Sequence, residues 1–307
     1  MACELLTLKR IGSLISLVIL SATGLLAAGT GNKVCTVADV AGAYAFFADG
    51  SILVPGTPIT GPFSRIGYFT ADGKGGIQTF VLPDYNGINF GQETFGGTYT
   101  VSSDCALDIV EFVPAPIFAN AEFKGQVALG GNQITFMLFH TDNPFAPAIT
   151  TVAGFGTLRE AIPGVPVPLT ACTANNLDGS WSMEINGFIN LPPIGTGSTP
   201  YRQVGSIQLD GKSGGMAGSF VVSNNGTMSQ QTASGTYTVS NDCTFDLSYT
   251  IGATAWGIRG SIVDPNHAFI ALNNPGPTFP GIGILTSAVA TGNLLRQSGG
   301  IPGFLSH

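Results

Sequence analysis

The chain has 307 residues, of which 44% are hydrophobic and only 9% are charged. This hydrophobic content excludes an intrinsically disordered chain, and 11 basic against 18 acidic residues, a net charge of −7, argue against a nucleic-acid-binding protein. Globular proteins average about 25% charged residues, so the low charge together with 43 glycines favours an exported, β-rich protein over a cytosolic enzyme.

Residues 1–29 have the three-part pattern of a secretory signal peptide. Lys9 and Arg10 precede an apolar stretch at 11–26, and small residues follow at 27–29. The apolar stretch is short and interrupted by glycine and serine, which disfavours a membrane-spanning helix of about 20 residues. We therefore expect export to the periplasm, the cell surface or the extracellular space, with an uncleaved N-terminal anchor as the alternative.

The rest of the chain alternates apolar and polar residues and is punctuated by Gly, Pro, Asn and Asp, without a helical periodicity. This pattern predicts strands in the first half near 40–48, 65–71, 77–82, 93–101, 106–113, 121–129, 133–140 and 150–159. Consecutive strands without helices predict an all-β fold, an antiparallel up-and-down barrel of about eight strands. A two-sheet β-sandwich is the alternative.

The second half of the chain repeats the first. The segment Gly97–Cys105 returns almost unchanged as Gly235–Cys243, and the Asp-Gly-Lys turn at 72–74 returns at 210–212. A match of this length at a constant offset indicates a duplication, so we expect two tandem barrels. The expected domains are repeat 1 at 30–160, a proline-rich linker at 161–168, repeat 2 at 169–298 and a C-terminal tail at 299–307.

Four cysteines beyond the leader fall two per repeat at matching positions. In an exported chain this predicts one disulfide per repeat, Cys35 with Cys105 and Cys172 with Cys243. Because no close Cys-x-x-Cys spacing is present, a zinc site is disfavoured, and we expect neither a metal nor a cofactor. Each disulfide ties the segment before the first strand to the fifth strand, so this segment should close one end of its barrel.

The other end of each barrel, where the long connections lie, is expected to form an open cup. The alternation of side chains points Arg65 and Glu111 into barrel 1, and His140 shares a face with apolar residues of its own strand. We expect Arg65, Glu111 and His140 to bind a small apolar or anionic ligand there. A strand bulge, or a position on the solvated rim, is the alternative explanation of these three residues.

The repeated motif Gly-Thr-Tyr-Thr-Val-x-x-Asp-Cys, with the Asp-Gly-Lys turn upstream of it, resembles a group of uncharacterised exported bacterial proteins. The likeness covers both repeats and implies no activity. In outline the expected barrels are similar to lipocalin or calycin barrels and to allene-oxide-cyclase-like barrels. That second likeness is one of architecture alone and assigns no catalytic residue.

Three functions fit these observations. The first is an exported non-catalytic protein that binds a small ligand or a partner at a cell surface or in a matrix. The second is an isomerase or cyclase that uses Glu111 and His140 as acid–base groups in the cup of repeat 1. The third is a single outer-membrane barrel of about 16 strands, which the linker and the two cysteine pairs disfavour.

Overall fold

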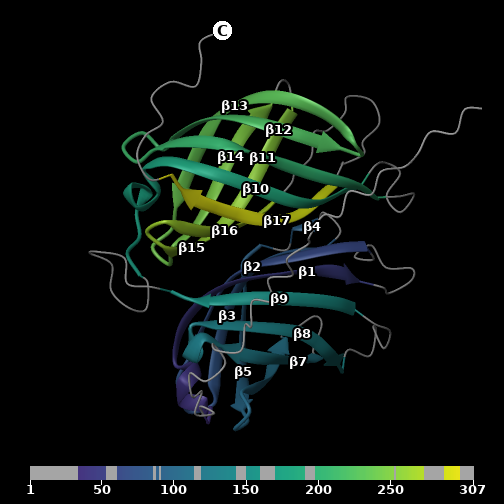
Figure 1. The fold of residues 1–307 in the computed structure, drawn as a ribbon, viewed down its shortest axis with the longest axis vertical. Coiled ribbons are helices and arrows are strands. Elements are labelled where there is room, and N and C mark those ends of the chain that lie inside the picture. Colours follow the sequence, from purple (N-terminus) through teal and green to yellow (C-terminus); the bar gives the residue numbers. More distant parts are fainter. Residues whose placement is uncertain are drawn as a thin grey trace, which may run out of the picture. The chain divides into compact units, whose positions relative to one another are not determined.

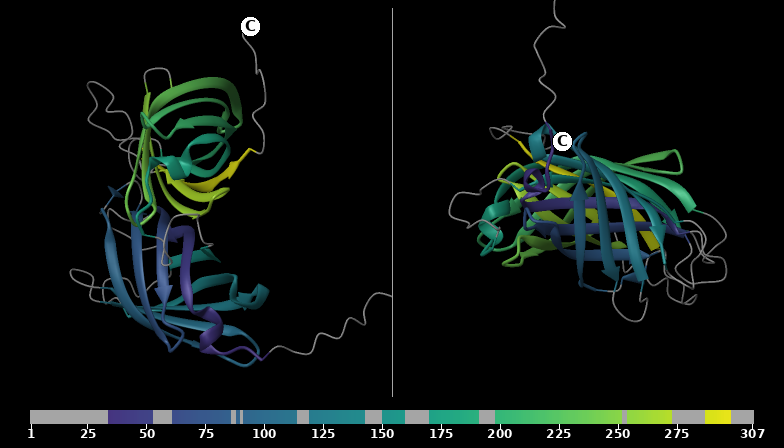
Figure 2. Two further views of the ribbon diagram at one scale, coloured as in Figure 1. Left: turned by 90° about the vertical axis from the view of Figure 1, so that its left-hand side faces the viewer. Right: turned by 90° about the horizontal axis from the view of Figure 1, so that it is seen from below.

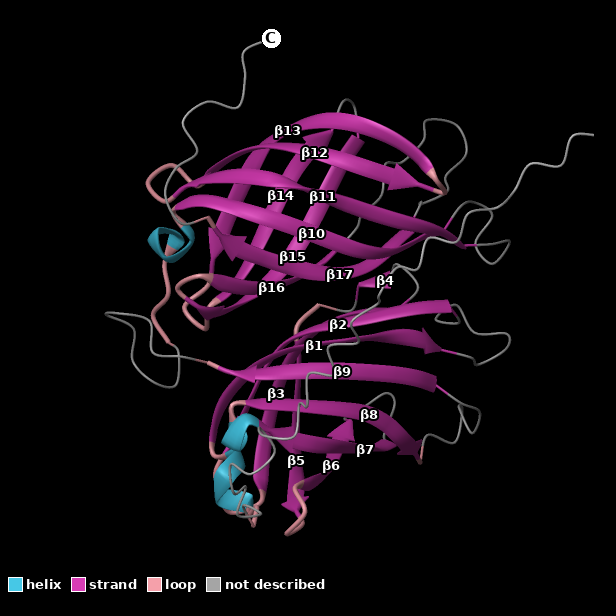
Figure 3. Cartoon of the chain, viewed as in Figure 1, coloured by secondary structure: helices cyan, strands magenta, loops and turns pink. Residues whose placement is uncertain are grey.

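The structure is a computed structural model that describes residues 34–52, 61–85, 88–89, 91–113, 119–142, 150–159, 170–190, 198–251, 254–272 and 287–297. The expected leader at 1–29, linker at 161–168 and tail at 299–307 lie outside these residues. Strands dominate the described chain, whose helical segments are short 3-10 turns (Figure 3). None of its helices is long and apolar enough to cross a membrane.

Barrel 1 is the first of two closed antiparallel sheets (Figure 1). Its strands are β1 (Gly42–Ile52), β2 (Gly61–Ala71), β3 (Gly76–Tyr85), β4 (Ile88–Asn89), β5 (Glu93–Val101), β6 (Ala106–Val113), β7 (Ala119–Ala128), β8 (Gln133–Thr141) and β9 (Thr150–Leu158). The ring closes because β1 pairs with both β2 and β9. The two-residue β4, which pairs only with β3, was not predicted from the sequence.

Barrel 2 closes in the same up-and-down order (Figure 2). Its strands are β10 (Gly179–Asn190), β11 (Ser198–Asp210), β12 (Gly215–Asn224), β13 (Thr227–Val239), β14 (Thr244–Ile251), β15 (Thr254–Asp264), β16 (His267–Leu272) and β17 (Ser287–Arg296). The predicted fold class, two tandem up-and-down barrels, is confirmed. The alternatives of two sandwiches and of one large barrel are wrong, because each sheet closes on itself.

The strand registers allow the two barrels to be compared position by position. Gly97 lies opposite Glu111 in barrel 1, and Gly235 lies opposite Tyr249 in barrel 2. Glu111 and Tyr249 therefore occupy the same place, and we call such residues counterparts. An outer-face ion pair recurs in this comparison, between Asp108 and Lys124 at 2.8 Å and between their counterparts Asp246 and Arg259 at 3.0 Å.

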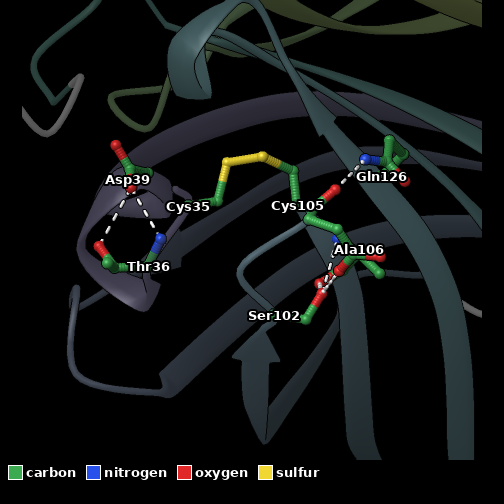
Figure 4. The surroundings of a disulfide bond; sticks show 8 residues. Cys35, Thr36, Asp39, Ser102, Cys105, Ala106 and Gln126 are labelled. Atoms are coloured by element: carbon green, nitrogen blue, oxygen red, sulfur yellow. Dashed lines mark hydrogen bonds between the residues drawn. A yellow bond between two sulfur atoms is a disulfide. The ribbon is translucent and has the colours of Figure 1, made fainter. Parts of the chain in front are cut away.

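A disulfide and a short 3-10 turn close one end of barrel 1. The predicted pair Cys35–Cys105 is present, with the two Cα atoms 5.0 Å apart (Figure 4). The turn η1 (Val37–Val40) follows Cys35, and its first carbonyl accepts a hydrogen bond of 2.9 Å from the inward-facing hydroxyl of Tyr99. Gly131 packs against the same segment so closely that a Cβ atom there would lie 2.0 Å from the carbonyl oxygen of Asp39. The lead segment thus lies across the end of the barrel, as predicted.

Barrel 2 is closed by the same arrangement. Cys172 and Cys243 form the second predicted disulfide, again with the Cα atoms 5.0 Å apart. The turn η3 (Ala174–Leu177) accepts a hydrogen bond of 2.9 Å from the Tyr237 hydroxyl, the counterpart of Tyr99. Each disulfide spans about 70 residues, a loop whose closure removes about 4 kcal/mol of chain entropy from the unfolded state.

Side chains fill the interiors of both barrels. Buried residues on alternate positions of the strands form one apolar cluster per barrel. In barrel 2 the largest of them are Trp181, Tyr201, Phe220, Phe245 and Tyr249. An eight-stranded barrel is just wide enough for its own side chains to fill, and aromatic residues of this size leave little room for anything else.

A third apolar cluster joins outer faces of the two barrels. Phe47 and Phe155, from β1 and β9, contact Phe269 of β16, with ring centroids 5.2 and 6.2 Å away respectively. Beside this cluster the buried guanidinium of Arg159 lies 4.4 Å from the centre of the Tyr68 ring and donates to the Asp242 carbonyl at 3.2 Å. Burial lowers the pKa of Arg159 to about 10, so the contact holds a partly desolvated cation.

We expect the two disulfides to differ in their sensitivity to a thiol reductant. Cys105 is partly exposed, whereas Cys172 and Cys243 are fully buried under the end of barrel 2. In the folded protein dithiothreitol should therefore open Cys35–Cys105 first, because the attacking thiolate needs access to a sulfur atom. Timed alkylation followed by peptide mass spectrometry measures both rates. Equal rates, or faster opening of the second bridge, would show that exposure does not control the reaction.

We expect the protein to lose stability at alkaline pH. Burial raises the pKa of Tyr44, Tyr85 and Tyr237 from 10.0 to about 12. The stability gained by keeping these phenols neutral is complete below pH 10 and is lost as the pH rises through about 12. Burial also lowers the pKa of Arg159 and of Arg296, which acts in the opposite direction over this range, but these are two groups against three.

Parallel pH titrations followed by circular dichroism and by tyrosinate absorbance test this expectation. Ionisation of the buried tyrosines should coincide with loss of the β-sheet signal. Smooth ionisation of all tyrosines near pH 10 in a chain that remains folded would contradict it.

Candidate functional site

A buried ion pair crosses the interior of barrel 1. Arg65 on β2 and Glu111 on β6 both point inward, as the strand alternation predicts, and Arg65 Nη2 lies 3.2 Å from Glu111 Oε2. Only 8% of Arg65 and 5% of Glu111 is exposed. Burial lowers the pKa of Arg65, but Glu111, Tyr85 and Glu93 together more than offset this and leave it above the ordinary value, so the guanidinium stays charged.

Aromatic rings surround this ion pair. The Arg65 guanidinium carbon lies 5.1 Å from the centre of the Phe95 ring, a distance typical of a cation–π contact. On the same strand as Arg65, Phe63 packs on Tyr85, with ring centroids 5.0 Å apart. Burial raises the pKa of Glu93, and the positive charge of Arg65 only partly opposes this. Among the described residues, the ion pair therefore lies inside a packed interior.

A cavity of about 10 Å³ lies against Arg65 and Glu111. Its other walls are apolar side chains, among them Phe46, Phe69 and Phe136. Such a volume is about the minimum for one water molecule. Arg65 Nε and Glu93 Oε2 are buried and have no hydrogen-bond partner among the described residues. A water molecule donating to Glu111 and accepting from Arg65 fits this site in size and in chemistry.

His140 does not lie with Arg65 and Glu111, so the expectation that the three share one interior is wrong. Glu122 pairs with His140 whereas the next residue, Phe123, pairs with Leu138, which leaves Phe139 as a bulge. The extra residue turns His140 to the outer face, where 61% of its side chain is exposed and Nε2 lies 2.9 Å from Asp142 Oδ1. A bulge of this kind re-aims every side chain that follows it.

Barrel 2 has an uncharged hydrogen-bonded group at the place of the ion pair. Gln203, the counterpart of Arg65, is fully buried, and its Oε1 accepts hydrogen bonds from Tyr201 at 2.6 Å and from Tyr249 at 3.3 Å. Burial raises the pKa of both tyrosines above the ordinary value, so they stay neutral and donate. The charged interior is thus a property of barrel 1 within the described part of the chain.

Sequence reasoning missed Glu93 and Tyr85, which border the ion pair. Glu93 lies on the inward face of β5 together with Phe95 and Tyr99, and Tyr85 lies on the inward face of β3 together with Ile77. Extending the inward–outward alternation to the ends of both strands would have predicted that these two side chains point into the barrel. Across the described ranges no cluster of three or more His, Cys, Asp or Glu side chains has the arrangement of a metal site.

Comparisons with known proteins assign no family. No family model matches the chain, and no curated protein sequence matches it. A solved structure of EF1p2_mFAP2b bound to DFHBI is 15% identical, with a TM-score of 0.30 over 40% of this chain and 96% of that one. Isotype 1 transferrin binding protein B of serogroup B Neisseria meningitidis is 8% identical, with a TM-score of 0.27 over 83% and 76% of the two chains.

A protein of unknown function from the DUF3598 family of Nostoc punctiforme is 12% identical, with a TM-score of 0.25 over 86% of this chain and 99% of that one. Similarities at these identities and TM-scores carry no argument about function. The candidate site therefore has to be interpreted from its own geometry.

We expect Glu111→Gln to destabilise barrel 1 by about 3 to 5 kcal/mol, because it leaves the buried charge of Arg65 without a counter-ion. The matched control is the double variant Arg65→Met with Glu111→Leu, which removes both charges and keeps similar volumes. This double variant should regain most of the lost stability. Urea unfolding of the three proteins measures the difference. A double variant as unstable as Glu111→Gln would mean that the ion pair itself is net stabilising.

Proposed function

We propose that the protein is an exported, non-catalytic component of a cell surface or matrix that acts through the outer faces of its barrels. The observation that carries this proposal is the filled interior. Small-molecule pockets have volumes of about 300 to 1,000 Å³, whereas the cavity beside Arg65 and Glu111 measures about 10 Å³. A barrel packed in this way offers its exterior to partners.

Export is supported by the covalent framework. Two disulfides hold the closed ends of the barrels, and disulfides persist in oxidising compartments such as the periplasm and the extracellular space. The basic and apolar pattern at 1–29 is consistent with the same route. The low proportion of charged residues suits a chain whose stability rests on closed sheets and cross-links.

The positions of Glu111 and His140 argue against an isomerase or cyclase mechanism. That mechanism needs Glu111 and His140 within reach of one substrate, yet Glu111 is paired with Arg65 inside the barrel and His140 is paired with Asp142 outside it. General acid–base catalysis requires both groups within hydrogen-bond distance of the reacting atoms. The non-catalytic function is therefore the better supported of the two.

Binding of a small polar or anionic molecule beside Arg65 is the second candidate function. It is favoured by the unpartnered, buried Arg65 Nε, which would donate to such a ligand. The aromatic walls of the cavity, among them Phe46, Phe69 and Phe136, would have to move to admit anything larger than water.

Native mass spectrometry of the purified mature chain separates these two functions. We expect the mass of the polypeptide with two disulfides and no retained small molecule. A co-purified molecule that is lost in Arg65→Met but kept in the barrel 2 control Gln203→Met would overturn the proposal in favour of ligand binding. Comparison with the spectrum of the denatured chain distinguishes a bound molecule from a covalent modification.

A further inference from the structure

The hairpin between β12 and β13 of barrel 2 turns on a two-residue loop, Asn225 and Gly226 (Figure 3). The two strands pair up to Asn224 and Thr227, which lie opposite each other. Both loop residues have a positive φ, 49° for Asn225 and 82° for Gly226. A type I′ turn requires a positive φ at both central residues and prefers asparagine followed by glycine. The local sequence therefore determines this turn.

The loop is open to solvent. Asn225 and Gly226 are both exposed, and a Cβ atom placed on Gly226 would have no atom beyond its chain neighbours within 4 Å. The Gly226 N–H lies beyond the last pair of the ladder, so it makes no ladder hydrogen bond. The Asn225 N–H donates to the Pro200 carbonyl at 2.9 Å, which ties the turn to β11. The backbone nitrogen of Gly226 is thus accessible beside an accessible side-chain amide.

An asparagine amide that precedes glycine can react with the backbone without an enzyme. The Gly226 nitrogen attacks the side-chain carbonyl carbon of Asn225, and the new C–N bond closes a five-membered succinimide. The bond from that carbon to the amide nitrogen breaks, and the amide nitrogen leaves as ammonia with the proton of the Gly226 N–H. Water then adds to either imide carbonyl and opens the ring to aspartate or to isoaspartate. Glycine favours the attack because it has no side chain to shield its nitrogen.

We propose that Asn225 is a site of spontaneous deamidation in the folded protein, with water as the co-reactant. This inference goes beyond the proposed function and does not depend on it. Each event adds one negative charge to the tip of the hairpin. Isoaspartate also carries the main chain through the side-chain carbon, which adds one methylene to a two-residue loop. We expect the longer loop to lose the bond to Pro200 and to loosen the ends of β12 and β13.

The same dipeptide at Asn186 and Gly187 provides a control within barrel 2. Gly187 lies inside β10, opposite Tyr201 of β11 and Ala290 of β17. Because β10 is paired on both sides at this point, the ladder holds the Gly187 N–H. A Cβ atom on Gly187 would lie 2.2 Å from the carbonyl oxygen of Val289, so the neighbouring strand packs closely against it. The barrel must open locally before this nitrogen can attack.

Timed incubation of the full mature chain in ¹⁸O-labelled water at mildly alkaline pH tests the proposal. Digestion with pepsin in acid and peptide mass spectrometry then measure the exchange of amide nitrogen for labelled oxygen at each asparagine. In the folded protein Asn225 should convert at least about tenfold faster than Asn186, because local opening precedes reaction in the strand. In the chain unfolded in urea with its disulfides reduced, the two rates should become similar. A third Asn-Gly pair, at 86–87, lies outside the described residues and is left out of the comparison.

Equal rates at Asn225 and Asn186 in the folded protein would overturn the proposal. An Asn225 that stays intact in the folded protein but converts in the unfolded chain would overturn it as well, because it would show that the turn protects the amide. The variant Asn225→Gly keeps a sequence that type I′ turns accept and removes the reacting amide. Its hairpin peptide should take up no labelled oxygen at position 225.

The variant Asn225→Asp separates the added charge from the longer main chain. It carries the same charge as the deamidated protein, and Asp-Gly also suits a type I′ turn. In hydrogen exchange, freshly prepared Asn225→Asp should match the fresh wild type at the ends of β12 and β13. Aged wild-type protein that contains isoaspartate should exchange faster there. Equal protection in all three samples would overturn the expected loosening of the hairpin.

Discussion

Closure of an eight-stranded sheet is the constraint on which the rest of this structure depends. A ring of this size encloses a space that side chains alone can fill, and every strand must therefore give half of its residues to that space. Barrel 1 and barrel 2 both meet this requirement with aromatic residues and a 3-10 turn held by a disulfide. A few interior polar positions and the residues of the outer face can therefore differ between the two barrels.

The two interiors satisfy the same volume with different chemistry. Glu111 in barrel 1 lies near the bulky Phe95, whereas the larger Tyr249 in barrel 2 lies near Ala233, the counterpart of Phe95. Barrel 1 thus combines a small carboxylic acid with a large ring, whereas barrel 2 combines a large phenol with a methyl group. The charge of Arg65 accompanies Glu111 in one barrel, and the neutral Gln203 accompanies Tyr249 in the other. The difference in charge between the two interiors is therefore consistent with two ways of filling the same volume.

The contact between the barrels is directional for a similar reason. Phe47 and Phe155 bind Phe269, but their counterparts on barrel 2 are Glu184 and Asn293, and the counterpart of Phe269 on barrel 1 is Thr135. Each barrel thus presents the apolar face on one side only. Polar replacements on the unused sides stop this particular contact from repeating between copies, and any association of whole molecules has to use other surfaces.

Strand alternation, repeated motifs and cysteine positions predicted the barrels, both disulfides and the inward direction of Arg65 and Glu111. These features are local or periodic, so a single chain reveals them. The position of His140 could not be predicted in this way, because one unpaired residue at Phe139 reverses the alternation and nothing in the local sequence marks it.

The volume of the cavity inside a barrel could not be predicted from the sequence either. Alternation says which side chains point inward, but only the three-dimensional structure shows that the cavity between Arg65, Glu111 and their apolar neighbours measures about 10 Å³. The outer faces add a further limit, since an outward apolar residue such as Ile66 is covered by the neighbouring barrel whereas its counterpart Val204 is exposed. Whether an outward residue is a contact or a surface depends on what lies against it, and this is why function in a closed barrel has to be sought by comparing the exteriors of its two copies.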